Sequence, residues 1–420
     1  MARIIGVTAR EVLDSRGRPT VEAIVQTEKG QFSAIAPSGA SRGKQEALEL
    51  RDGEKRFFGR GVRKVIANIQ GPIARKLKGM NPAKQREIDL ALIELDKTPQ
   101  KTKLGGNAMV AVSMAVARAG AAQANLPLFE YLGHLSANHK FTLPVPMMNV
   151  INGGEHAGNG LQIQEFLILP VGAPSFSEAL QCGVTVYESL RELIVKKYGK
   201  IATGVGDEGG FAPPFKNTTE ALDLLSSAVE KSGYSKWVRL GLDCASSEFF
   251  SAGKYRFEGR VMSGHALGEW YEGIVRHYNL LSLEDPFAEE DWNSWEQFSH
   301  HYGKIQVVGD DLLVTNPLRV ARAIAREACN ALLLKVNQVG TLSEALEAAR
   351  VASEGKWRVI VSHRSGESED SFISDLVVGL AAGQSKFGAP VRGERTAKYN
   401  QLLRIEEQLG KRAKYATPFS

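Results

Sequence analysis

The stretch Val238-Arg239-Leu240-Gly241-Leu242-Asp243 is a short apolar run that ends on a carboxylate. Similar runs follow along the chain, and a polar residue ends each one: Glu284, Asp310, Lys335, His363 and, after a weaker run, Lys386. The intervals between these residues range from 23 to 41 residues, the length that a loop, a helix and the next parallel strand need. One acidic residue after a strand is usually a turn or a helix cap, but six polar residues in register indicate a shared site. The spacing predicts a β/α barrel with these side chains at its mouth.

The first part of the chain has a different pattern. Residues 3–13 and 20–27 alternate like the two strands of a hairpin around Asp14-Ser15-Arg16-Gly17. Long helices are predicted at 108–124, 177–197 and 219–231. We therefore expect two domains, a smaller α+β domain over residues 1–135 and a β/α barrel over residues 136–420.

Composition excludes several classes of protein. Hydrophobic residues make up 43% and charged residues 24% of the 420 residues, as in a globular enzyme. The apolar stretches fall short of the roughly 18 residues of a membrane span, and the first residues lack the apolar core of a signal peptide. The net charge of +5 is scattered along the chain and forms no basic stripe. We expect a cytoplasmic protein that neither binds nucleic acid nor spans a membrane.

Three carboxylates end consecutive apolar runs, at Asp243, Glu284 and Asp310. Their mutual repulsion makes such a cluster costly without a cation, and all-oxygen ligands suit Mg²⁺. The alternative is a salt-bridge network with Lys335 and Lys386. A lysine beside a metal ion has a lowered pKa, so either lysine is a candidate base, and Lys386 can equally bind a substrate carboxylate.

Three further segments contain side chains that could bind a ligand or take part in catalysis. His363-Arg364-Ser365-Gly366 follows a predicted strand and offers the donors that bind phosphate. Glu165 follows Gln164 after an apolar run, and Glu208 lies among glycines in Gly206-Asp207-Glu208-Gly209-Gly210, so the two form an acidic pair of which one can hold a proton. Ser38-Gly39-Ala40-Ser41-Arg42-Gly43 is typical of a mobile lid. Each loop alone can equally be an ordinary tight turn.

Taken together, these segments resemble the enolase family over essentially the whole chain. The most specific matches are Gly206-Asp207-Glu208-Gly209-Gly210, Glu284-Asp285-Pro286-Phe287, Gly309-Asp310-Asp311-Leu312, Leu334-Lys335-Val336-Asn337-Gln338 and Ser362-His363-Arg364-Ser365-Gly366-Glu367. The resemblance implies a small α+β cap and a modified TIM-like β/α barrel whose first strands break the regular order. It also implies a homodimer or higher oligomer that dehydrates 2-phosphoglycerate reversibly to phosphoenolpyruvate, with two Mg²⁺ ions, the second arriving with substrate.

The resemblance also assigns roles by motif. Lys335 is the expected base that removes the C2 proton, and Glu208 is the expected acid that assists loss of the C3 hydroxyl, with Glu165 beside it. The first Mg²⁺ is expected on Asp243, Glu284 and Asp310, and the second is contacted through Ser38. The remaining expected contacts to substrate come from Gln164, His156, His363, Arg364, Ser365 and Lys386.

The chain departs from the family pattern at Arg42, Glu155, Ser385, Phe387 and Gly393, none of which has an expected chemical role. Two other functions compete with the one above. The first is a member of the same superfamily that acts on a non-phosphorylated acid, such as a racemase or lactonising enzyme. The second is a binding or structural protein built on this fold. The Arg364-Ser365 pair argues against the first, and the complete catalytic set argues against the second.

Overall fold

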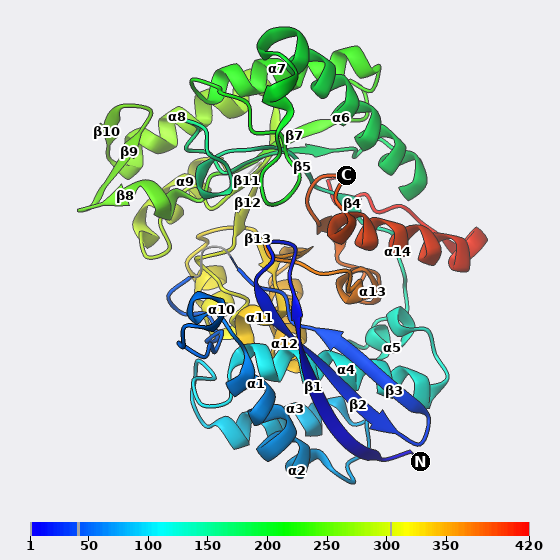
Figure 1. The fold of residues 1–420 in the computed structure, drawn as a ribbon. Helices are drawn as coiled ribbons and strands as arrows, with labels where there is room; N and C mark the ends of the chain where they lie inside the picture. The colour runs from blue at the N-terminus through cyan, green and yellow to red at the C-terminus, as the bar shows by residue number, and fades with distance from the viewer. Residues whose placement is uncertain (1, 40–42, 303–304, 420) are drawn as a thin grey trace.

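The computed structural model describes residues 2–39, 43–302 and 305–419. Its N-terminal part is a three-stranded antiparallel sheet backed by helices (Figure 1). The strands are β1 (Ile4–Leu13), β2 (Pro19–Thr27) and β3 (Gly30–Ile35). Leu13 pairs with Pro19, which confirms the predicted hairpin around residues 14–17. The lid residues 40–42, including Arg42, lie outside the described residues.

The helices of this part are the 3₁₀-helix η1 (Arg56–Gly59), α1 (Arg63–Asn68), the π-helix η2 (Ile69–Ile73), α2 (Ala74–Leu77), α3 (Gln85–Asp96), α4 (Gly106–Ala124) and α5 (Leu128–Leu135). They contact the sheet through α1, η2, α2 and α4. Helix α4 is the central one, and it packs against β2 and β3. Its many alanines and glycines let the backbone come close to the sheet, so α4 is almost completely buried. The predicted helix 108–124 is confirmed and begins two residues earlier.

The rest of the chain forms a nine-stranded barrel sheet. Its strands are β4 (Val145–Pro146), β5 (Met148–Asn152), β6 (Glu165–Leu169), β7 (Arg239–Asp243), β11 (Leu280–Glu284), β12 (Gln306–Gly309), β13 (Ala331–Leu334), β14 (Arg358–Ser362) and β15 (Gly383–Lys386). Strand β4 pairs with β15 and β5 pairs with β6. Between them, the Met147 amide donates to the carbonyl of Ser385. The single segment 145–152 therefore joins both edges and closes the barrel.

One strand runs against the others. Strand β6 is antiparallel to β5 and β7, whereas the remaining pairs from β7 round to β4 are parallel. Glu165, which begins β6, therefore lies opposite Asp243, which ends β7, and opposite Asn152, which ends β5. A residue at the start of a strand thus reaches the same mouth as residues at strand ends. The predicted α/β fold with an irregular first part of the barrel is confirmed.

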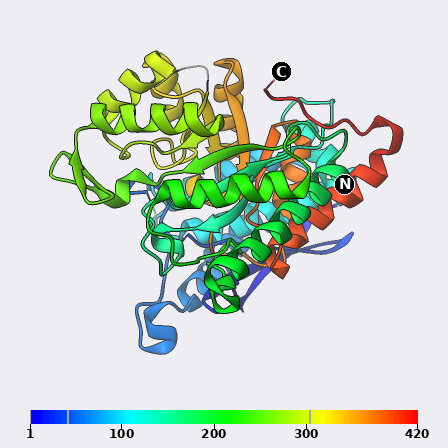
Figure 2. The same ribbon diagram turned by 90° about the horizontal axis from the view of Figure 1, so that it is seen from above.

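Helices surround the barrel, and α6, α7 and α14 lie together along one flank (Figure 2). The barrel part contains 3₁₀-helices η3 (Gly154–His156), η4 (Lys200–Thr203), η5 (Ser246–Phe249) and η6 (Gly410–Arg412), and α-helices α6 (Phe176–Tyr198), α7 (Thr218–Ser232), α8 (Gly264–Tyr278), α9 (Trp292–Tyr302), α10 (Pro317–Ala325), α11 (Val336–Val339), α12 (Leu342–Glu354), α13 (Phe372–Gly379) and α14 (Gly393–Leu409). Side chains cap several starts. Ser175 accepts from the Glu178 amide before α6, and Asn217 accepts from the Glu220 amide before α7.

Among the described helices, none combines the length and apolar character needed to cross a membrane.

A small antiparallel sheet interrupts the barrel pattern. Its strands are β8 (Phe250–Ser251), β9 (Lys254–Phe257) and β10 (Arg260–Met262), all between β7 and α8. It accounts for the long interval from Asp243 to Glu284, because this crossover holds three strands as well as a helix. The sequence analysis did not predict it.

The two parts of the molecule meet at a backbone bridge between Ser38 and Gly366. The Ser38 amide donates to the Gly366 carbonyl at 2.8 Å, and the Gly366 amide returns a bond to the Ser38 carbonyl at 2.9 Å. A Cβ atom on Gly366 would lie 2.3 Å from Arg16 Nη2 and 2.7 Å from the Ser38 carbonyl oxygen. The absence of a side chain at this position therefore allows the base of the lid segment to approach the loop that follows β14.

We expect Gly366→Ala to destabilise the protein by about 1–3 kcal/mol, because the added methyl group cannot be accommodated without moving Arg16 or the backbone. Thermal unfolding monitored by circular dichroism measures the effect. Gly273→Ala is the matched control, because an exposed helical glycine with nothing within 4 Å of a Cβ atom should tolerate alanine or gain stability. Equal melting temperatures for Gly366→Ala and wild type would contradict the tight approach.

Candidate active site

The barrel mouth contains a narrow cavity of about 30 Å³. Most of the residues that the sequence singled out line it, although they come from distant parts of the chain: Gln164, Glu165, Glu208, Asp243, Asp310, Lys335, His363, Arg364, Ser365 and Lys386. Glu284 contacts this group through Lys386. The side chain of His156 lies outside the described part of the structure. The predicted convergence of strand-end side chains is therefore seen directly.

Lys386 is the centre of the first charge cluster. Its Nζ lies 2.7 Å from Asp243 Oδ2, 2.8 Å from Glu284 Oε1 and 3.2 Å from Glu165 Oε1. Burial opposes the charge on this ammonium, but the surrounding carboxylates outweigh burial and raise the pKa of Lys386 well above its usual value. Lys386 is therefore a permanent cation in this arrangement.

One ammonium cannot compensate three carboxylates. Burial, followed by the charge of Glu208, raises the pKa of Glu165 well above its usual range. Burial, followed by the charge of Asp243, does the same to the pKa of Glu284. The Oε2 atoms of both glutamates are buried and have no hydrogen-bond partner among the described residues. These two oxygens fit a proton or a metal ion, because an unpaired buried oxygen is costly.

Lys335 belongs to a second cluster with Asp310. The Lys335 ammonium donates to Asp310 Oδ2, and Gln338 donates to Asp310 Oδ1 at 2.8 Å. The sequence analysis expected a lowered pKa for a lysine beside a metal ion, and that conditional expectation stays a prediction. Burial does favour the neutral amine, but the carboxylates of Asp310 and Glu284 outweigh it, so the pKa of Lys335 is raised.

Two acidic residues were missed as site residues by the sequence analysis. Asp285 accepts bonds from the Asp310 amide at 2.9 Å and from the Asp311 amide at 2.8 Å, so it fixes the turn that follows β12. Carboxylate oxygens of Asp285, Asp310 and Asp311 all lie within 4.8 Å of one another. Burial and the charge of Asp310 raise the pKa of Asp311 to about 8. Both residues directly follow a predicted ligand within segments that resemble the family, but the sequence analysis assigned no role to either.

The mouth as a whole has more carboxylates than cations. Its carboxylates are Glu46, Glu165, Glu208, Asp243, Glu284, Asp285, Asp310 and Asp311, and its cations are Lys335, Lys386 and Arg364. The donor atoms are all oxygens, which is the set that Mg²⁺ prefers. The residues present therefore fit a hard divalent cation, with Asp243, Glu284 and Asp310 as the predicted holders. The salt-bridge network that the sequence left as an alternative is also present, because both lysines pair with these carboxylates.

Glu208 lies in a separate corner of the cavity. Asn149 donates to Glu208 Oε2 at 3.0 Å, and His363 Nε2 lies 3.4 Å from the same oxygen. Burial lowers the pKa of His363 to about 4, so the imidazole is neutral at neutral pH. The Glu208 loop is held from behind by Tyr187, whose hydroxyl donates to the Gly209 carbonyl at 2.7 Å. These contacts hold Glu208 in a defined position in the cavity.

Arg364 is engaged by a residue of the N-terminal part. Its Nη1 donates to Glu46 Oε2 at 2.8 Å and to Asn337 Oδ1 at 3.2 Å. Both Arg364 and Glu46 are buried, and Glu46 lines the cavity. Glu46 was missed because its polar surroundings in the sequence resemble an ordinary surface segment. Its position gives the N-terminal part a direct contact with the candidate anion-binding arginine.

Ser38 lies beside the Arg364 loop and does not line the cavity. Its hydroxyl accepts bonds from Arg16 at 3.2 Å and from Arg51 at 3.1 Å. Two guanidinium groups thus face the oxygen that the resemblance assigns to the second Mg²⁺. In this arrangement Ser38 is not brought to the carboxylates.

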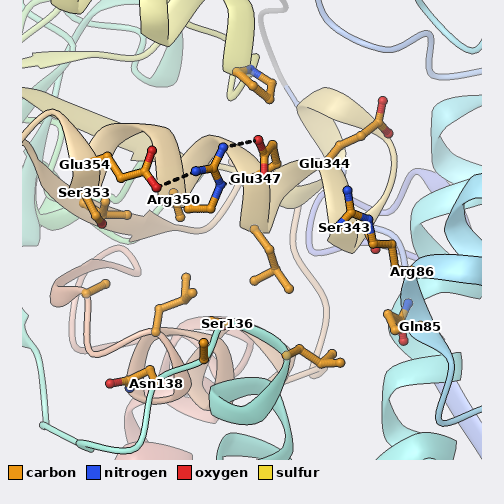
Figure 3. Close-up of a pocket in the computed structure, with 18 of the residues that line it drawn as sticks. Gln85, Arg86, Ser136, Asn138, Ser343, Glu344, Glu347, Arg350, Ser353 and Glu354 are labelled. Atoms are coloured by element: carbon orange, nitrogen blue, oxygen red, sulfur yellow. Dashed lines mark hydrogen bonds and ion pairs between the residues drawn. The ribbon is translucent and has the colours of Figure 1, made fainter.

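A wider cavity of about 780 Å³ lies elsewhere, between α3, the end of α5 and α12 (Figure 3). Two of its glutamates pair with an arginine of the same helix, since Arg350 binds both Glu347 and Glu354 (Figure 3). Among the described residues that line it, none is one that the sequence singled out for chemistry. Size alone therefore does not mark the site, and the barrel mouth remains the candidate.

The fold and the mouth together define a barrel enzyme whose site is built from carboxylates and lysines. Comparison with protein families agrees with this class. The description "Enolase, N-terminal domain" matches residues 4–132, and "Enolase, C-terminal TIM barrel domain" matches residues 140–418. The chain belongs to the enolase family, and it is a lyase of that family.

We expect Lys386→Met to destabilise the protein by about 3–5 kcal/mol in EDTA, because three buried carboxylates lose their shared cation. Mg²⁺ should then restore much of the loss, and it should stabilise this variant more than wild type, where it competes with Lys386. Thermal unfolding across a Mg²⁺ titration measures both effects.

Lys398→Met is the matched control for this experiment. Lys398 is equally buried but pairs with one carboxylate, that of Glu367, at 2.8 Å. The Lys398→Met variant should be destabilised by a similar amount with and without Mg²⁺. The same Mg²⁺ response in both variants would show that the cluster around Lys386 does not hold the ion.

Proposed function

We propose that this protein catalyses the Mg²⁺-dependent, reversible dehydration of 2-phosphoglycerate to phosphoenolpyruvate, a step of glycolysis and gluconeogenesis. One observation carries the proposal. Lys335, which follows β13, and Glu208, which lies in the loop after η4, line a single cavity together with a surplus of carboxylates and a buried arginine. A dehydration needs a base, an acid on another side and stabilisation of negative charge, and this cavity contains groups suited to all three.

Asp243, Glu284 and Asp310 hold the first Mg²⁺ in this proposal, and Ser38 contacts the second, which arrives with substrate. Bound there, the ions supply positive charge for the substrate carboxylate, where negative charge gathers after the C2 proton leaves. The orphaned Oε2 atom of Glu284 supports this assignment, because a buried carboxylate oxygen needs a partner. Ser38 requires a rearrangement, since Arg16 and Arg51 occupy its hydroxyl.

Lys335 is the proposed base, and it acts as the neutral amine. In the arrangement described, its pairing with Asp310 keeps the ammonium protonated. A cation on Asp310 would replace that ion pair, and burial would then favour loss of the proton from Nζ. The amine nitrogen takes the C2 proton of the substrate and becomes an ammonium. The electron pair of the C2–H bond stays on the substrate.

Glu208 is the proposed acid. Its carboxyl gives a proton to the C3 hydroxyl, the C3–O bond breaks, and water leaves. The electron pair left at C2 forms the C2–C3 double bond. The product is therefore the substrate minus one water. Glu165 shares the cavity, and its raised pKa supports a role in retaining a proton near this pair. His363, His156 and Gln164 complete the proposed pocket.

Arg364 and Ser365 bind the phosphate in this proposal, and Lys386 binds the substrate carboxylate. Both cations have partners inside the protein, which substrate would have to displace: Glu46 for Arg364, and Asp243, Glu284 and Glu165 for Lys386. The planar guanidinium suits the bidentate contact with phosphate, and the lysine acts as a point charge. When substrate binds, its phosphate and carboxylate replace the protein's own carboxylates beside these two cations. Each cation therefore keeps an anionic partner throughout binding.

The proposal extends to organisation and setting. Residues 1–135 act as a cap that carries the lid segment, and residues 136–420 act as the catalytic barrel. The protein is proposed to work in the cytoplasm as a homodimer or a higher homo-oligomer, as the family resemblance implies. Neither nucleic acid nor a membrane takes part.

The direct test is the rise in ultraviolet absorbance when 2-phosphoglycerate is added. We expect a rise with Mg²⁺ and none after exhaustive chelation. Glycerate should give no signal, because it lacks the phosphate that Arg364 binds, and Arg364→Lys should weaken binding and slow turnover. Equal activity on glycerate would favour a different acid substrate within the same family.

The two proton transfers are separable. Lys335→Ala should stop exchange of the C2 hydrogen with solvent deuterium, because no other base lies at that carbon in the proposal. Glu208→Gln should block product formation by at least ~10²-fold and leave the exchange measurable, since the amide keeps the shape but gives up no useful proton. Deuterium incorporation followed by NMR, with each variant saturated in Mg²⁺, measures both. Exchange that survives in the lysine variant and vanishes in the glutamate variant would reverse the roles.

A further inference from the structure

Arg395 is a fully buried arginine in the first turn of α14 that reaches the back of the active site. Its Nη1 lies 2.7 Å from His363 Nδ1 and donates to the Arg364 carbonyl at 2.7 Å. Its Nη2 donates to the Asp207 carbonyl at 3.0 Å and to the Ser365 carbonyl at 2.5 Å. The guanidinium thus contacts the residue before Glu208 and three consecutive residues of the loop after β14.

The contact with His363 has a chemical consequence. A guanidinium has only donors, so His363 Nδ1 must be the acceptor and carries no hydrogen. A neutral imidazole then carries its single hydrogen on Nε2. That nitrogen faces Glu208 Oε2 at 3.4 Å. Arg395 therefore determines which nitrogen of His363 is a donor toward the proposed catalytic acid.

We propose that Arg395 is a positioning residue that holds His363 as the Nε2–H tautomer, so that the imidazole is a donor toward Oε2 of Glu208, the proposed acid. This inference rests on the proposed function. Asn149 Nδ2 and His363 Nε2 both point at Oε2 of that carboxyl group. An oxygen that faces two N–H donors acts as an acceptor, so these two donors fix the orientation of the Glu208 carboxyl group.

The charges around His363 agree with a neutral ring. Glu208 and Glu367 favour the imidazolium, whereas burial and the positive charge of Arg395 disfavour it, and burial is the largest effect. The pKa of His363 falls to about 4. The ring therefore keeps one hydrogen throughout the neutral range, and the choice between its two nitrogens is left to hydrogen bonding.

The backbone beside Arg395 and His363 packs closely against both side chains at Gly388. Gly388 has φ +85°, in the left-handed region, and a Cβ atom there would lie 2.9 Å from Arg395 Cδ and 3.0 Å from His363 Cε1. The same atom would lie 2.9 Å from the Glu208 carbonyl oxygen. The adjacent Ala389 amide donates to that carbonyl at 3.0 Å. The arginine, the histidine and the acid loop therefore form one packed unit.

The competing interpretation is that Arg395 only ties two loops together through their carbonyl groups. The two roles differ in what they predict. A purely structural arginine affects binding and both proton transfers alike when it is removed. A residue that sets the tautomer affects the step that uses Glu208, and it changes the hydrogen on His363 directly.

The first experiment observes the tautomer in the intact wild-type protein. Long-range ¹H–¹⁵N spectra of protein labelled with ¹⁵N-histidine separate the two nitrogens of each ring, and the chain has only 8 histidines. The signal lost in His363→Gln identifies residue 363. We expect a protonated Nε2 and an unprotonated Nδ1 from pH 6 to 8. A protonated Nδ1 would overturn the proposal without any change to Arg395.

The second experiment compares Arg395→Met with Arg395→Lys. The methionine variant should lose the preference for Nε2–H and slow dehydration by about 10- to 100-fold, while C2 deuterium exchange stays within about 3-fold of wild type. The lysine variant keeps a cationic donor and should retain the tautomer and more of the rate. Arg358→Met is the matched control, because Arg358 bonds a carbonyl, that of Pro418, at the opposite end of β14 and should alter neither the tautomer nor the ratio of the two rates.

Each outcome decides the matter. An unchanged tautomer in a folded Arg395→Met variant, or equal loss of exchange and dehydration, would overturn the proposal. If that variant does not fold, the spectra of wild type and Arg395→Lys decide. If wild type shows the Nε2–H tautomer but does not act on 2-phosphoglycerate, the proposed function fails and the link between Arg395 and His363 still stands.

Discussion

The barrel mouth is governed by a surplus of buried negative charge. Asp243, Glu284 and Glu165 gather around a single ammonium, that of Lys386, and Asp310 pairs with Lys335. Ion pairs taken out of water are stable only when their geometry and remaining hydrogen bonds are satisfied. The rest of the structure provides that support, from the closed barrel that fixes each strand end to the turns whose amides bond Asp285. A cluster so poorly compensated is expected where a ligand brings the missing charge.

The cavity is small because the protein's own groups occupy their partners. Lys386, Lys335 and Arg364 each bind an internal carboxylate that competes with a ligand. Binding of substrate and metal in such a site is an exchange of ion pairs, in which internal anions and cations are released as external ones enter. The energetic cost of the exchange is lower than that of exposing a bare charge, since each buried group keeps a partner of opposite sign.

Much of this arrangement could be predicted from the sequence, because the strand ends of a parallel barrel are marked by a polar residue after an apolar run. Asp243, Glu284, Lys335 and His363 all lie where that rule places them. Glu165 does not follow the rule, since it begins an antiparallel strand, and the sequence analysis singled it out instead as a partner of Glu208 in an acidic pair. Glu46 and Arg395 could not be found by pattern. Their roles depend on contacts between distant segments, and a polar residue in a polar stretch carries no signal of what it will touch.

The closure of the barrel has a consequence for how the protein is made. Strand β15 supplies Lys386, and it pairs with β4 from far earlier in the chain. During synthesis the segment 145–152 emerges long before its partner, so one edge of the sheet stays open while β6 to β14 are added. Pairing between distant segments is slow to form, and an open edge can pair with another chain. The nascent protein therefore keeps an aggregation-prone open edge until β15 leaves the ribosome. That one strand then completes both the barrel and the charge cluster at its mouth.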